Sequence, residues 1–285
     1  MYFPRYWAKA SVDGPGRLGQ TINVLAWGWS DVSTEEALAR ATTRAQSALA
    51  RIPPDASQAR HAKYYEDRPF REPVLQDHSR GPIKALITRN SFGCEVLNTD
   101  CVAFADIDYD APQVGIFGSL FGAKKKLAAL AAAWEERTLD HLREWQNSNS
   151  SWSFRVYRTA GGLRLLRTSG LLAADSPEAS AWLEAVGSDP LYRRLCLNQK
   201  SFRARLTPKP WRCGLKQLRV YFPWAQPGER AALEKWLNAY QPKCESFAVC
   251  ELLESLGADI PARELEPLIA LHDERTSVGS GRPLA

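Results

Sequence analysis

The most informative feature of this sequence is a short apolar run that ends in alternating carboxylates. Residues 101–105 are apolar, and aspartates then follow at every second position, Asp106, Asp108 and Asp110. Because a β-strand turns alternate side chains to the same side, a strand here would project all three acids from one face. Like charges at the end of a buried strand repel one another unless a positive charge compensates them. The run therefore predicts a buried strand whose acidic end binds a divalent cation, with Mg²⁺ or Mn²⁺ suited to such oxygen ligands.

The same acids also have a purely structural interpretation. Carboxylates at a strand end can face water, act as caps, or pair with a buried arginine. The two interpretations predict different effects on stability when an aspartate is replaced by the neutral Asn. If a metal binds, replacing Asp106 or Asp108 by Asn removes a repulsion and leaves the fold intact, whereas structural acids lose stabilising hydrogen bonds.

A basic segment lies downstream, at residues 202–212, with four cations and two aromatic rings in eleven residues. Arg203 and Arg205 alternate with apolar residues, so a strand would place both guanidinium groups on one face. Arginine matches phosphate oxygens bidentately, and aromatic rings offer stacking surfaces for bases. Together with Lys209 and Arg212, these cations predict a phosphate-binding segment. The alternative is an amphipathic edge strand whose arginines face solvent.

The sequence predicts a hairpin between the acidic and the basic segment. Alternating apolar side chains from 152 to 156 indicate a strand, Gly161-Gly162 a tight turn, and residues 163–168 the returning strand. A glycine pair also allows a ligand to approach the backbone closely. Because Gly-Gly is first of all a hairpin signal, it is only weak evidence for phosphate binding.

These elements, in this order, resemble the archaeo-eukaryotic primase superfamily, and within it the primase-polymerase branch. In that family an Asp-x-Asp at a strand end binds the catalytic metals, and a Ser/Thr-rich glycine turn ending in His contacts the phosphates of the incoming nucleotide. The first motif corresponds to Asp106 and Asp108. The second corresponds to Thr159, Gly161 and Gly162, with Arg164 in place of the His.

The resemblance covers roughly residues 80–215 and includes one open position. The family has a third acid on a later strand, for which Asp175 and Asp189 are both candidates here. Neither residue ends a clear strand in the sequence pattern. The resemblance thus implies the fold more directly than it implies the activity.

What the resemblance implies is an α+β fold, with a mostly antiparallel central sheet, flanking helices and a small C-terminal helical segment. It implies a metal-dependent nucleotidyl transferase that uses Mg²⁺ or Mn²⁺, with nucleic acid and a nucleoside triphosphate as partners. Asp106 and Asp108 would be the catalytic and metal-binding residues. The nucleotide- or phosphate-binding residues would be Thr159, Gly161, Gly162, Arg164, Arg203, Arg205, Lys209 and Arg212.

Two other functions fit the same residues. A metal-dependent nuclease would use the same carboxylates to activate water. A non-catalytic nucleic-acid-binding module on the same fold would explain the Arg at position 164 and the missing third acid.

The composition of the chain is that of a folded protein of 285 residues, with 45% hydrophobic and 24% charged residues. The formal net charge of +5 permits a polyanionic partner without requiring one. The six cysteines form no C-x-x-C pair, and residues 1–7 lack the apolar core of a signal peptide. Since no apolar run approaches the length of a membrane span, we expect a cytoplasmic protein with reduced thiols and no membrane association.

The domain prediction is an α+β domain over residues 1–225, followed by a helical segment over 226–285 whose tail is disordered from Ser277. His272 and Asp273, at the end of the last predicted helix, are either a catalytic pair or a plain helix terminus. Strands are expected at 21–29, 83–88, 95–97 and 218–222, and helices after Ser33 and at 124–146, 179–186, 229–240, 244–256 and 262–272.

Overall fold

The computed structural model describes residues 1–15, 20–51, 69–109, 123–258 and 260–285. The chain divides into two compact units, residues 2–73 and residues 74–285, with Met1 grouped with the second. The sequence prediction instead placed a boundary at 225. Asp110, one of the three predicted acids, lies outside the described residues.

The smaller unit is a β-hairpin covered by one helix. Strand β1 (Tyr6–Pro15) pairs antiparallel with β2 (Thr21–Ser30), and α1 (Thr34–Ala50) packs on the pair. Ser33 caps the helix by accepting a hydrogen bond from the backbone N–H of Glu36, as expected. A Cβ on Gly28 would lie 2.1 Å from the carbonyl oxygen of Ala37, so the absence of a side chain lets the helix lie directly on the strand.

The larger unit contains two four-stranded sheets in which every named strand pair is antiparallel. The first has the order β10-β7-β8-β6, and the second the order β3-β4-β5-β9. This confirms an α+β fold with antiparallel sheets and flanking helices. The strand bounds are β3 Val74–Asp77, β4 Ala85–Arg89, β5 Glu95–Thr99, β6 Phe104–Asp108, β7 Phe154–Thr159, β8 Gly162–Arg167, β9 Phe202–Arg205 and β10 Cys250–Leu256.

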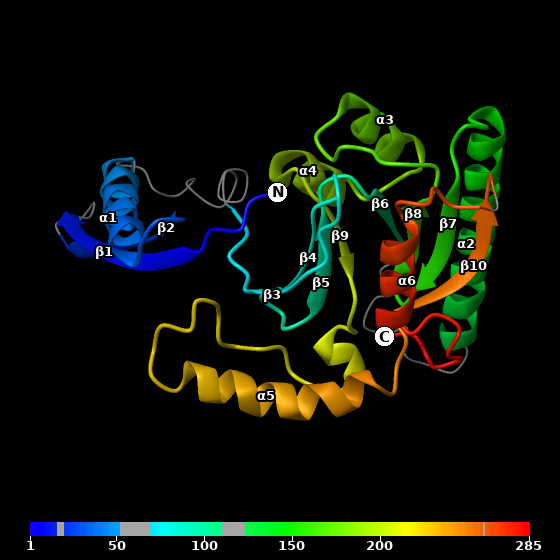
Figure 1. Cartoon of the computed structure of the whole chain (residues 1–285). Coiled ribbons are helices and arrows are strands. Elements are labelled where there is room, and N and C mark those ends of the chain that lie inside the picture. Colours follow the sequence, from blue (N-terminus) through cyan, green and yellow to red (C-terminus); the bar gives the residue numbers. More distant parts are fainter. Residues whose placement is uncertain (16–19, 52–68, 110–122, 259) are drawn as a thin grey trace. The chain divides into compact units, whose positions relative to one another are not determined.

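Two helices cover opposite faces of the first sheet (Figure 1). Helix α2 (Ala123–Ser148) contacts β7 through the pairing of Glu135 with Arg158. Helix α6 (Glu266–Arg275) contacts the alternate face of β7, where Tyr157 donates to Asp273. Arg164 of β8 pairs opposite Tyr157 in the sheet register and so lies on the α6 face.

The remaining helices connect and border the sheets (Figure 1). Their bounds are α3 Pro177–Ala185, α4 Pro190–Gln199, the 3₁₀ helix η2 Pro210–Cys213 and α5 Glu229–Cys244. Asp189 caps α4 by accepting from the backbone N–H of Tyr192 at 2.7 Å. Within the described part of the chain, no helix combines the length and apolar character that crossing a membrane requires.

Three local predictions were wrong. Residues 244–256 do not form one helix, because 250–256 is an edge strand that pairs with β7. Residues 218–222 form no strand. The tail is packed rather than disordered, since Ala285 is buried and its N–H donates to the carbonyl of Ala248. Local periodicity could not reveal the edge strand or the packed tail, because each depends on contact with a distant segment.

Candidate functional site

The two sheets meet where the acidic strand β6 lies beside the arginine-rich strand β9. They are separate in their strand pairing, and Tyr192 of α4 bridges them. Its hydroxyl lies 3.2 Å from the carbonyl oxygens of Phe104 on β6 and Arg203 on β9. It also accepts a hydrogen bond from the Arg203 N–H. The acidic and basic segments predicted from the sequence are therefore brought together at one junction.

At this junction, the Asp106 carboxylate is paired with a buried arginine. Arg164 Nε donates to Asp106 Oδ1 at 3.0 Å, and the two side chains are 2% and 33% exposed. Burial opposes the charged form of Arg164, but Asp106, Cys250 and Tyr192 together favour it, so the pKa of Arg164 is raised. The positive charge that compensates Asp106 is thus supplied by the protein itself.

The other contacts of Arg164 fix its guanidinium in place. Its Nη1 donates to the carbonyl oxygen of Arg205 at 2.9 Å and lies 3.6 Å from the thiol of Cys250. These contacts tie β8 to β9 and to β10. Because Nε and Nη1 donate to protein atoms and the residue is buried, Arg164 is a poor ligand for an exposed phosphate.

Asp108 has a different environment from Asp106. Burial raises the pKa of Asp108, and the nearby charges of Asp106 and Asp189 raise it further, while Lys209 and Arg205 oppose this. Asp108 lies at the exposed end of β6, so the burial that acts on its carboxyl group is partial. Asp108 is therefore a carboxylate whose charge is still under-compensated.

The structure separates the two candidates for a third acid. The backbone N–H of Asp189 donates to the carbonyl oxygen of Asp106 at 2.9 Å, and its carboxylate influences Asp108. Asp175 instead pairs with Lys200 at 3.0 Å. Only Asp189 thus lies beside the acidic strand, where one of its oxygens already caps α4.

The acids at this junction could supply only part of the ligands of a divalent metal ion, and the others would come from substrate or water. Among the described residues, no group of three His, Cys, Asp or Glu side chains is arranged to hold a metal ion. Asp106 retains one oxygen beyond the pair with Arg164, and Asp108 carries unrelieved charge. Mg²⁺ is commonly bound by one or two carboxylates together with substrate phosphates, so Asp106 and Asp108 fit such a cation.

A group of crowded cations faces these acids. Burial lowers the pKa of Arg205, and Arg164 and Arg212 lower it further. Burial also lowers the pKa of Lys209, and Arg205 and Arg212 add to this shift. Nε of Arg205 is buried and has no hydrogen-bond partner among the described residues. This group, called the cation cluster below, comprises Arg205, Lys209 and Arg212.

The predicted alternation of β9 is confirmed. Phe202 and Ala204 are fully buried, while Arg203 and Arg205 are partly exposed. Arg205 and Lys209 contribute to the electrostatics of Asp108, so the strand and the loop after it face the acids.

The glycine turn serves the fold of the hairpin. The Thr159 hydroxyl donates to the carbonyl of Gly162 and accepts from the N–H of Gly161. A Cβ on Gly162, which has φ +149°, would lie 2.0 Å from the carbonyl oxygen of Ile107. Gly162 therefore permits β8 to begin against the end of β6. A Cβ on Gly161 would instead lie 3.1 Å from Nη2 of Arg212, which brings the cation cluster to this turn.

The sequence missed a buried polar network behind Arg164. Asp273 accepts hydrogen bonds from Arg155 at 2.6 Å and from the Tyr157 hydroxyl at 2.8 Å. Its Oδ1 also lies 3.0 Å from His272 Nδ1, and His272 Nε2 lies 4.0 Å from the Cys250 thiol. Since His272 is fully buried, the pair is a structural element rather than an accessible catalytic one.

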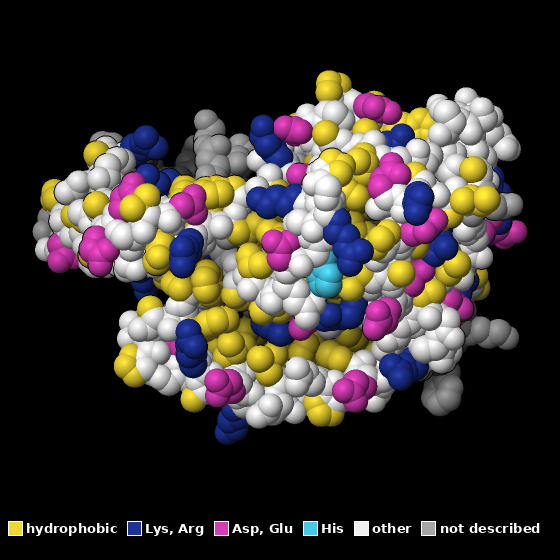
Figure 2. Space-filling view, viewed as in Figure 1, with side chains coloured by type: hydrophobic (Ala, Val, Ile, Leu, Met, Phe, Trp, Pro, Cys, Tyr) yellow, Lys and Arg dark blue, Asp and Glu magenta, His cyan; other side chains and the backbone are white. Residues whose placement is uncertain are grey.

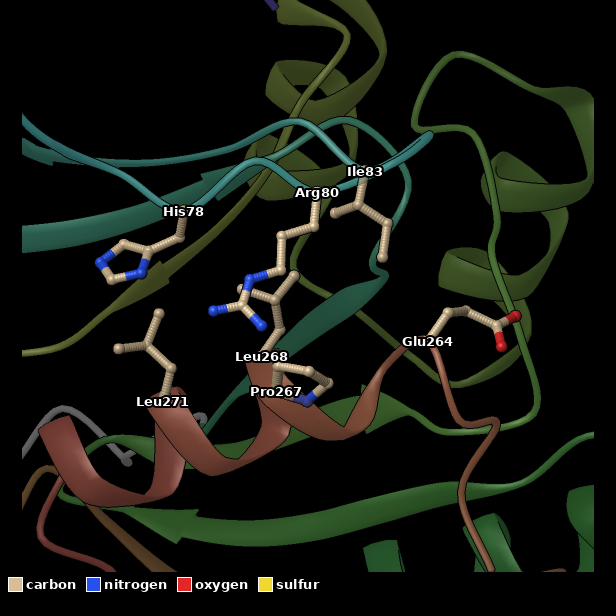
Figure 3. Close-up of a pocket in the computed structure, with 7 residues that line it drawn as sticks. All are labelled: His78, Arg80, Ile83, Glu264, Pro267, Leu268 and Leu271. Atoms are coloured by element: carbon tan, nitrogen blue, oxygen red, sulfur yellow. The ribbon is translucent and has the colours of Figure 1, made fainter.

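A small pocket lies apart from these residues, between α6 and the segment that follows β3 (Figure 3). Arg80 points toward α6, whereas the carboxylate of Glu264 points away from the pocket (Figure 3). No predicted site residue lines it. Its lining residues are His78, Arg80, Ile83, Glu264, Pro267, Leu268 and Leu271.

No protein-family model, no curated protein and no solved structure matches this chain. The resemblance to the primase superfamily therefore stays a prediction that rests on short motifs. The arrangement of charges at the β6–β9 junction is the remaining basis for a functional argument.

Proposed function

We propose that this protein is a metal-dependent nucleotidyl transferase that acts on nucleic acid, with its site at the β6–β9 junction. The observation that carries the proposal is the cation cluster beside two carboxylates. The pKa values of Arg205 and Lys209 are lowered by burial and then by neighbouring cations, and the acids Asp106 and Asp108 offset this only in part. A triphosphate would supply further negative charge to these cations, while a metal ion would relieve the charge of Asp108. Acids that hold metal and cations that hold phosphate are complementary parts of a phosphoryl-transfer site.

The roles of the residues follow from their environments. Asp108, and the oxygen of Asp106 that Arg164 leaves free, would hold Mg²⁺ or Mn²⁺. The metal would neutralise charge that develops on the phosphate oxygens. Arg205, Lys209 and Arg212 would hold the phosphates, and the unpaired Nε of Arg205 gains a partner when an anion binds.

Arg164 has a positioning role in this proposal. It holds Asp106 through one oxygen and reaches β9 through the carbonyl of Arg205. Where the primase family has a His that contacts nucleotide, this chain would thus have a cation that orients the first aspartate. Thr159 and Gly162 would form the turn that supports it.

A second candidate is a nucleic-acid-binding module without catalysis. The pairing of Asp106 with Arg164 favours it, because a carboxylate compensated by the protein has less need of a metal. The cation cluster serves either function, so the two differ only in whether Asp108 binds metal productively.

The experiment is nucleotide incorporation on primed and unprimed templates, with Mn²⁺ or Mg²⁺. We expect labelled product from the wild type and none from Asp108→Asn. Lys216→Ala, at an exposed cation beyond η2, is the matched surface control and should retain activity. Shortening of the template would indicate the nuclease instead. Binding of nucleic acid without product, in both metals, would overturn the transferase and leave the binding module.

A further inference from the structure

Two large aromatic side chains are exposed beside the cation cluster. Trp211 of η2 is 48% exposed, and Phe92, in the turn between β4 and β5, is 42% exposed. Their rings meet edge to face with centroids 5.5 Å apart. Nζ of Lys209 lies 5.6 Å from the centroid of the Trp211 ring. The aromatic platform, defined as Trp211 and Phe92, therefore offers stacking surfaces next to positive charge.

The segment that carries Trp211 is fixed by hydrogen bonds from Tyr240 of α5 and from Cys94. The hydroxyl of Tyr240 on α5 donates to the carbonyl of Pro208 and lies 3.0 Å from the Thr207 hydroxyl. The thiol of Cys94 donates to the same Pro208 carbonyl at 3.4 Å. Pro210, next to the tryptophan, is itself buried. The backbone under Trp211 is thus anchored while its ring stays exposed.

The turn that carries Phe92 is held by the same helix. Trp236 of α5 stacks on Tyr240 with ring centroids 4.4 Å apart. A Cβ on Gly93, at φ +94°, would lie 2.3 Å from the Trp236 ring. One aromatic pair on α5 therefore supports both halves of the platform, and α5 runs beside η2 (Figure 1).

The neighbouring charges identify the kind of ligand. Lys209 and Arg212 flank Trp211 in the sequence, and both belong to the cation cluster. Figure 2 shows Lys and Arg side chains together with hydrophobic side chains on the surface above α5. A rigid exposed ring between cations suits a nucleobase whose adjoining phosphates meet those cations. A paired base in a duplex has no free face to offer such a ring.

From this geometry we infer that the aromatic platform binds single-stranded nucleic acid by stacking an unpaired base on Trp211. The inference deepens the proposed function, on which it rests for the identity of the substrate. It adds that the strand bound beside the acids is unpaired, and that α5 supports its binding surface.

The test is equilibrium binding of a fluorescent oligothymidylate and of a blunt duplex, without metal or nucleotide. We expect Trp211→Ala to weaken oligothymidylate binding about tenfold, and Trp211→Phe to retain most of it. The salt dependence should keep its slope in Trp211→Ala, because no phosphate contact is lost, and flatten in Arg212→Ala. Tyr221→Ala removes an aromatic side chain of similar exposure, 47%, and should bind as the wild type does.

Two further measurements separate this inference from the proposed function. Gly93→Ala should weaken oligothymidylate binding while pyrophosphate binding, measured by calorimetry, is unchanged. An unchanged affinity in Trp211→Ala, or an equal loss for duplex and single strand, would overturn the platform. If the wild type incorporates no nucleotide but Trp211→Ala still loses oligothymidylate binding, the proposed transferase activity is excluded and the aromatic platform is supported.

Discussion

Arg164 donates through Nε to Oδ1 of Asp106 across 3.0 Å, and this pair makes the two aspartates of β6 chemically different. Asp106 has a buried countercharge, whereas Asp108 has two neighbouring carboxylates that raise its pKa in addition to burial. Two acids that the sequence presents as equivalent should therefore respond to the same substitution in opposite directions.

Replacing Asp106 by Asn should destabilise the protein, because it leaves the Arg164 guanidinium buried without a counterion. Breaking a buried pair typically costs about 3–5 kcal/mol. Since Asp106 is one-third exposed, we expect about 2 kcal/mol, measured by urea unfolding at pH 7 with a chelator present. A variant as stable as the wild type would show that the pair is not stabilising.

Replacing Asp108 by Asn should raise the thermal stability at pH 7. The pKa of Asp108 is raised in the folded protein, so ionisation favours the unfolded chain, and the gain from Asn should vanish at a pH below the unfolded value near 3.8. Thermal melts with a chelator measure this. Adding Mn²⁺ should raise the melting temperature of the wild type and leave that of the variant unchanged.

Replacing Gly162 by Ala should cost about 2 kcal/mol or more, because a Cβ there would overlap the carbonyl of Ile107 at a φ that favours glycine. Gly161→Ala is the matched control, since its Cβ meets only the flexible end of Arg212. Urea unfolding of both variants checks this. Equal losses would mean that the close approach of β8 to β6 is not what requires glycine.

His272 should make the protein less stable as the pH falls below about 6.5. Burial lowers the pKa of His272, and the charge of Arg164 lowers it further, while Asp273 and Asp106 oppose this. Below the unfolded pKa near 6.5 the unfolded chain takes up a proton that the folded chain does not, so stability is lost until the folded pKa is passed. The Cys250 thiol lies 4.0 Å from His272 Nε2.

The measurement is the free energy of unfolding between pH 5 and pH 8. His272→Asn keeps a donor toward Asp273 and should flatten the slope below pH 6.5, even if the variant is less stable throughout. His141→Asn removes an exposed imidazole and serves as the control. A slope in His272→Asn equal to that of the wild type would exclude this residue as the cause.

Local patterns in the sequence predicted the elements that carry the site. The alternation in β9 and the hairpin at Gly161-Gly162 depend on neighbouring residues, and both form as expected. Of the apolar run before Asp106, only Phe104 and Ala105 belong to β6, and residues 101–103 precede the strand. Asp189-Pro190, the start of α4, was a further cap signal that the prediction did not use.

The partner of Asp106 could not be predicted in the same way, because the register between β6 and β8 joins residues far apart in the chain. One signal was present. Arg164 stands between Leu163 and Leu165 in an apolar strand, and a cation in such a strand needs a buried acid. The sequence thus indicates that Arg164 has an acidic partner, whereas the fold determines that this partner is Asp106.

Tyr192 has one proton for two carbonyl oxygens, those of Phe104 and Arg203, at equal distances of 3.2 Å. A phenol can donate fully to only one of them at a time. The Tyr192 hydroxyl therefore holds β6 beside β9 together with Arg164, which binds both Asp106 and the carbonyl of Arg205. A continuous strand ladder would fix the separation of the two strands at many points, whereas here the Tyr192 hydroxyl can turn from one carbonyl oxygen to the other without breaking any backbone pairing.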